Sequence, residues 1–176
     1  MAGVSLQDIK NLREQTQAGV MDCKNALNEA DGDLAKAADL LRARGLILAS
    51  KKSDRATSEG AIDCYVHTGS RVAAIVEVNC ETDFVARTPE FRELVHNIAM
   101  QVAAMSPTLV EDTEEGIDLE SDLGDQSSLM KQPFIKDQTM TIRDLVNEVV
   151  ARVGENIRIR RFTRFSIGED LDITGE

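Results

Sequence analysis

The stretch RVAAIVEVNCETDFVARTPEFRELVHNIAMQVAAM, residues 71–105, contains a strand, a corner and a helix in succession. Residues 71–79 are nearly all apolar and β-branched, which predicts a strand covered on both faces. Thr88 followed by Pro89 is typical of a helix start, because threonine caps the helix and proline tolerates its first position. Apolar residues then recur at helical spacing until Pro107 ends the pattern.

The corner between this strand and helix, residues 79–87, is predicted to be a loop. Within it, the apolar pair Phe84 and Val85 directly follows charged residues. Two interpretations of Phe84 are open from the residues alone. The ring folds back and packs against the helix start, or it stays exposed as an anchor for a pocket on a partner.

The flanking segments predict the rest of a small sheet. Residues 61–67 and 71–79 form a hairpin around the turn Thr68-Gly69-Ser70. Thr141 caps a second amphipathic helix, and residues 156–167 then alternate apolar side chains with arginines, as in a strand with one solvated face. Because helices and strands occur in separate blocks, the chain is predicted to be α+β, with a small antiparallel or mixed sheet packed with helices.

The N-terminal part predicts a bundle of three short helices. Ser5 caps the first helix, the second covers residues 20–29, and the third follows Asp33 and ends at Gly45. We therefore divide the chain into a three-helix module (1–46), a linker (47–60), an α+β core (61–168) that includes an exposed acidic connection (108–130), and an acidic tail (169–176).

Composition disfavours several classes of function. The net charge is −11 and aromatic residues make up only 3%, so binding of nucleic acid or anionic membranes is disfavoured. Three cysteines without a CxxC pair indicate reduced thiols. No apolar run reaches the roughly 20 residues that span a bilayer, and residues 1–10 lack the apolar stretch of a secretory signal. We expect a cytoplasmic protein.

Patterns for chemistry are weak. The chain has no glycine-rich phosphate loop, and its two histidines lack ligand spacing to cysteine, so we expect no cofactor, no metal and no catalytic residues. Two alternatives compete with a protein-binding role. Cys80 and His67, on opposite arms of the hairpin, could form the nucleophilic pair of a cysteine hydrolase. An arginine-rich strand could instead bind RNA, or its side chains could pair with local carboxylates; its arginines are Arg158, Arg160, Arg161 and Arg164.

Several separate blocks resemble the elongation factor Ts family. VEVNCETDFVAR (76–87) is similar to the family's signature. LREQTQAGVMDCKNALNEADGDLAKAADLLRARG (12–45) resembles its N-terminal helical module, which is related in fold to ubiquitin-associated (UBA) domains. The further matching blocks are KKSDRATSEG (51–60), QPFIKD (132–137) and VGENIRIRRFTRF (153–165). The blocks occur in the family's order, and the resemblance covers residues 4–105 and 131–167.

This resemblance implies a guanine-nucleotide exchange factor that does no covalent chemistry. Members of the family bind elongation factor Tu carrying GDP and accelerate nucleotide release. Their TDFV segment enters the GTPase near its magnesium site and helps to dislodge the ion. The segment matches here at Thr82, Asp83, Phe84 and Val85.

The resemblance also implies a second contact and an assembly. The docking face of the helical module corresponds to Val20, Met21 and Lys24, although Val20 and Met21 could equally belong to the core of the bundle. Short members of the family pair as homodimers, and this chain has a single core as they do. Most members carry a longer segment, often a helical hairpin, where only residues 108–130 stand here.

Overall fold

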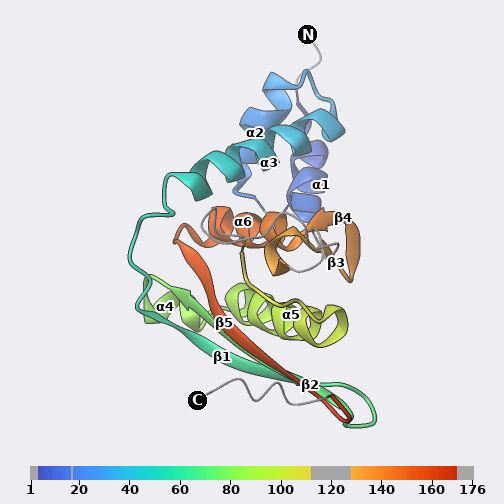
Figure 1. The fold of residues 1–176 in the computed structure, drawn as a ribbon. Helices are drawn as coiled ribbons and strands as arrows, with labels where there is room; N and C mark the ends of the chain where they lie inside the picture. Colours follow the sequence, from blue (N-terminus) through green and yellow to red (C-terminus); the bar gives the residue numbers. More distant parts are fainter. Residues whose placement is uncertain (1–3, 17, 112–127, 170–176) are drawn as a thin grey trace, which may run out of the picture.

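The computed structural model describes residues 4–16, 18–111 and 128–169 of the 176-residue chain. It shows three N-terminal helices followed by a three-stranded sheet with helices packed against it (Figure 1). The predicted α+β class is confirmed. The middle of the predicted acidic connection, residues 112–127, lies outside the described residues, as does nearly all of the predicted tail.

The N-terminal helices are α1 (Leu6–Thr16), α2 (Val20–Glu29) and α3 (Leu34–Ser50). The carboxylate of Asp33 caps α3 by accepting hydrogen bonds from the first backbone N–H groups of the helix. The three helices enclose a small apolar cluster of their own. Its buried members are Leu12, Cys23, Ala26, Leu27, Ala30 and Ala37.

The third helix does not end at Gly45, as the sequence predicted, but continues to Ser50. Gly45 is buried where α3 packs against α6 (Ile142–Val153), and a Cβ there would lie 3.4 Å from the Cβ of Ala151. A glycine inside a helix costs about 1 kcal/mol relative to alanine, but here it allows the two helices to approach closely. The position serves helix packing instead of helix termination.

The main sheet has the order β1 (Glu59–Val66), β2 (Val72–Cys80), β5 (Ile157–Ser166), and all its pairings are antiparallel. Alternate residues of β2 are buried under α5 (Pro89–Met105), which lies along one face of the sheet (Figure 1). Ile75 points the other way and is 46% exposed. The prediction that this strand is covered on both faces is therefore wrong, because no described helix lies over the outer face.

Helices α5 and α6 begin as the sequence predicted. The side chain of Thr88 caps α5, and Thr141 caps α6 in a reciprocal capping box with Asp144. The apolar stripe of α5 meets the inner face of the sheet, and α6 packs against α5, so all of them share one continuous core (Figure 1). Its largest fully buried side chains include Phe91, Leu94, Ile98, Leu129 and Ile142.

A second, smaller hairpin was not predicted. It comprises β3 (Pro133–Phe134) and β4 (Asp137–Thr141), preceded by a short 3-10 helix at Leu129–Lys131. Leu129 is fully buried in the core, and the backbone N–H of Met130 donates to the carbonyl of Val110. The end of the predicted exposed connection therefore packs against the core.

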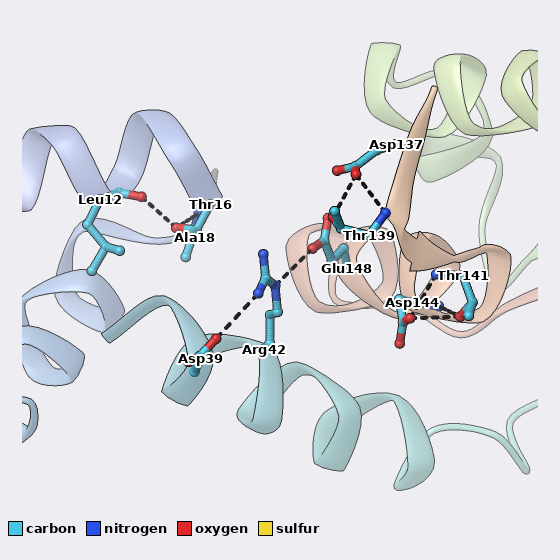
Figure 2. Close-up of polar contacts among 10 residues, drawn as sticks. All are labelled: Leu12, Thr16, Ala18, Asp39, Arg42, Asp137, Thr139, Thr141, Asp144 and Glu148. Carbon is cyan, nitrogen blue, oxygen red and sulfur yellow. Dashed lines mark hydrogen bonds and ion pairs between the residues drawn. The ribbon is translucent and has the colours of Figure 1, made fainter. Parts of the chain in front are cut away.

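Polar contacts join α3 to the core (Figure 2). The guanidinium of Arg42 lies between Asp39, at 3.3 Å, and Glu148 of α6, at 3.9 Å. Partial burial raises the pKa of the Glu148 carboxyl, and the charge of Arg42 opposes that shift. Ion pairs this exposed contribute little energy, whereas Ala49 of α3 also packs against the main core.

Candidate partner-binding site

The corner after β2 contains a single helical turn, α4 (Asp83–Ala86), where the sequence predicted a loop. Thr82 caps this turn, because its hydroxyl accepts a hydrogen bond from the backbone N–H of Val85 at 3.4 Å. Thr88 then caps α5 one turn later. The corner is thus two capped helix starts in close succession, which fixes its backbone.

Phe84 is the exposed large apolar side chain of this corner, with 82% of its surface accessible. Its neighbours Val85 and Ala86 are buried in the main core and anchor the turn from below. The interpretation that the ring folds back against the helix start is therefore wrong. A phenyl ring held in solvent on a buried, capped turn gains free energy when a partner buries it, so this ring is a candidate anchor.

The other predicted residues of this segment have different surroundings. Asp83 pairs with Arg87 at 2.8 Å, and both side chains remain about half exposed or more. The backbone N–H and the hydroxyl of Thr82 donate to the carboxylate of Glu155. Val85 is only 8% exposed, so its side chain packs internally. Of the four predicted residues, Phe84 is therefore the exposed one, Thr82 and Asp83 are partly exposed, and Val85 is buried.

The predicted module face lies at the start of α2. Val20 and Met21 are both more than half exposed, and Lys24 is exposed on the same helix. The alternative that Val20 and Met21 belong to the bundle core is therefore wrong. Gly19 precedes them at the N-cap position and provides no side-chain cap.

Comparison with known proteins gives the family. Residues 45–120 match the family model described as elongation factor TS. An elongation factor Ts from Synechococcus sp. (strain RCC307) is 43% identical over 206 aligned positions, which cover 100% of this chain and 95% of the relative. The chain belongs to the elongation factor Ts family.

Two further relatives have the same name. The elongation factor Ts of Moorella thermoacetica is 43% identical, with 96% of this chain and 97% of the relative covered. That of Thermotoga neapolitana is 45% identical, with 95% and 98% covered. The chain is accordingly a translation elongation factor. The alignment with the Synechococcus relative spans more positions than the 176 residues here, so that relative has residues without a counterpart in this chain.

The cysteine hydrolase alternative fails on geometry. Cys80 pairs with Glu59 at one end of the hairpin, whereas His67 follows the pairing of Val66 with Ala73 at the other end. Burial raises the pKa of the Cys80 thiol to about 11, and the nearby charge of Glu155 adds to this shift. The thiol therefore stays protonated at neutral pH and cannot serve as a nucleophile.

The arginine strand is engaged mostly within this elongation factor Ts chain. Arg160 and Arg161 both pair with Glu77 across the sheet, at 3.6 and 2.7 Å. Arg164 donates to the backbone carbonyl of Ala103 and pairs with Glu169. Of the four arginines, Arg158 alone has a side chain with no hydrogen-bond or ion-pair partner among the described residues. This arrangement favours pairing with local carboxylates over an RNA-binding surface.

The described residues provide no cluster of three or more His, Cys, Asp or Glu side chains that could hold a metal ion. In the same part of the chain, no helix is long and apolar enough to cross a bilayer. The residue that sequence reasoning missed is Glu155, which binds Thr82 from 73 positions along the chain. Local patterns cannot find such a pair; correlated changes at the two positions among relatives could.

Proposed function

We propose that this chain binds elongation factor Tu carrying GDP and promotes GDP release by displacing magnesium and the switch elements of the GTPase. The chain itself performs no covalent step, requires no cofactor, and acts in the cytoplasm. The observation that carries the proposal is the 82% exposure of Phe84 on a turn whose next two side chains, Val85 and Ala86, are buried. Such a ring reaches a partner without first rearranging its own fold.

The physical argument concerns the burial of the Phe84 ring in the partner GTPase. Magnesium neutralises charge on the phosphates and helps to hold the switch loops of a GTPase. An apolar side chain that enters this region displaces those loops and weakens ion and nucleotide binding together. Full burial of a phenylalanine side chain gains about 1.5–3 kcal/mol, and a rigid corner loses little conformational entropy on binding.

Thermodynamic linkage between nucleotide binding and factor binding then explains how the factor is released. A factor that binds the nucleotide-free GTPase best lowers its affinity for nucleotide, and nucleotide lowers the affinity for the factor by the same ratio. GTP therefore displaces the factor after exchange. Asp83 is placed to interact with partner backbone or with the surroundings of the cation, because its carboxylate is half exposed beside Phe84.

The three-helix module provides the second contact in this proposal. Val20 and Met21 offer exposed apolar surface and Lys24 a cation, all at the start of α2. These residues would contribute affinity for the GTPase, whereas Phe84 would act on nucleotide release. Two separate contacts on one chain raise the local concentration of the second once the first has formed.

The test is release of fluorescent GDP from elongation factor Tu, chased with unlabelled GDP and followed by stopped flow. The native chain is expected to raise the release rate in proportion to its concentration until the GTPase is saturated. A release rate that does not change with concentration would refute the proposed function.

We further propose that the chain pairs with a second copy through the outer face of the main sheet. Two adjacent cross-strand rows carry no charge: Cys64, Ile75 and Thr163, and beside them Val66, Ala73 and Phe165. The salt bridge between Glu77 and Arg161 borders them. A chain with a net charge of −11 meets its own copy most easily through an uncharged, apolar surface.

The substitution Ile75→Glu is expected to convert the dimer to a monomer, because an unpaired carboxylate would be buried between the two sheets. Sedimentation velocity measures the change. Ile47→Glu on α3 is the matched control, since Ile47 is also exposed but lies away from the sheet. A native chain that is monomeric at micromolar concentration would overturn this proposal.

A further inference from the structure

We infer that Glu155 is a positioning residue that sets the orientation of Phe84, an inference that rests on the proposed exchange function. Glu155 lies in the short connection between α6 and β5, next to Asn156. It does not belong to the TDFV segment, and its side chain is only partly exposed. Its effect on the partner would pass through Thr82.

Both carboxylate oxygens of Glu155 bind the residue that caps α4. Oε2 accepts from the backbone N–H of Thr82 at 3.0 Å, and Oε1 accepts from the Thr82 hydroxyl at 2.7 Å. Hydrogen bonds to a charged acceptor are the stronger kind. No described cation pairs with Glu155, so its charge is directed at these two neutral donors.

The hydroxyl of Thr82 explains why this contact controls the turn. A hydroxyl has one proton and two lone pairs. Its proton points to Glu155, which leaves a lone pair free to accept from the N–H of Val85 and so to cap α4. Loss of the Glu155 acceptor would free the hydroxyl to rotate and would loosen the turn that carries Phe84.

Further hydrogen bonds between the Phe84 corner and the α6–β5 connection make the junction of these two segments rigid. The carboxylate of Glu81, also in the corner, accepts from the backbone N–H of Asn156 at 2.7 Å. The Asn156 amide donates in turn to the carbonyls of Ser53 and Arg55, at 3.1 and 2.8 Å. The junction thus fastens the Phe84 corner both to the core and to the segment that leads from the helical module.

The substitution Glu155→Gln keeps the size of the side chain but removes its charge and leaves one oxygen acceptor for the two donors of Thr82. GDP release promoted by this variant is expected to be roughly tenfold slower, with little change in affinity for the GTPase. Glu93→Gln, on the exposed side of α5, is the matched control and should match the native chain. If Glu155→Gln unfolds, Thr82→Ala removes the hydroxyl bond to Glu155 from the other side and leaves the backbone N–H bond in place.

A double-mutant cycle separates positioning from a general structural role. In the Phe84→Ala background, Glu155→Gln should cause no further slowing, because the side chain that it positions is absent. Additive effects of the two substitutions, or release by Glu155→Gln at the native rate, would overturn the inference. A native chain that fails to accelerate GDP release would refute the exchange function itself. That result is distinct from the outcomes of the double-mutant cycle, which compare variants of an active chain.

Discussion

Alanine in place of Phe84 is expected to slow GDP release from elongation factor Tu by about ten- to a hundredfold at a fixed concentration of the chain. A phenylalanine side chain gains about 1.5–3 kcal/mol on full burial, and each 1.36 kcal/mol changes a rate tenfold. Because we propose that the ring is buried only as the nucleotide leaves, the loss should fall mainly on the maximal rate.

The fold of the Phe84→Ala variant should be intact. The ring is 82% exposed in the free chain, so its removal opens no cavity in the core. The fluorescent GDP chase measures the rate, and thermal unfolding checks the fold. Ile47→Ala, which truncates an exposed apolar side chain on α3, is the control and should release GDP at the native rate. Equal rates for Phe84→Ala and the native chain would exclude the proposed role of the ring.

The substitution Gly60→Ala is expected to reduce the free energy of unfolding by about 3 kcal/mol or more. Gly60 pairs with Asn79 in the sheet and has a φ of +154°. A Cβ at this position would lie 2.2 Å from the carbonyl oxygen of Val78 and 2.8 Å from the Cα of Asn79. Backbone atoms of a central strand cannot move away without breaking the pairing of β1 with β2.

Gly69→Ala is the matched control for this collision. Gly69 lies in the hairpin turn with a φ of +88°, and a Cβ there would meet nothing within 4 Å. Only the left-handed conformation opposes alanine at this position, at a cost of about 1–2 kcal/mol. Urea denaturation of both variants measures the difference. Equal losses of stability would show that backbone strain, and not the close approach of Val78, requires glycine at position 60.

Local patterns in the sequence predicted most of the elements. The caps at Asp33, Thr88 and Thr141 start helices in the structure, and residues 20–29 form α2 as expected. These signals work because a cap or an apolar stripe depends on residues within one or two turns of each other.

Other features depend on contacts that local patterns do not contain. A glycine at position 45 predicts a helix end, yet α3 continues to Ser50 and Gly45 packs closely against α6. The apolar strand β2 has one face without a described helix over it, although its composition is that of a strand buried on both faces. The contact between Glu155 and Thr82 joins segments far apart in the chain. In each case the deciding neighbour is distant in sequence.

The exposure of Phe84 depends partly on local sequence and partly on contacts within the fold. The residues left two interpretations open, and only the burial of Val85 and Ala86 beneath the turn decides that the ring faces solvent. The role of the ring at a GTPase follows from the family and stays a proposal.

The most direct test of the central claim compares GDP release promoted by the native chain and by Phe84→Ala, first with magnesium and then with the ion removed by EDTA. If the ring acts on the ion and the loops that hold it, the difference between the two chains should shrink markedly once magnesium is gone. An equal difference in both conditions would contradict the account, because the ring would then act on release without involving the ion.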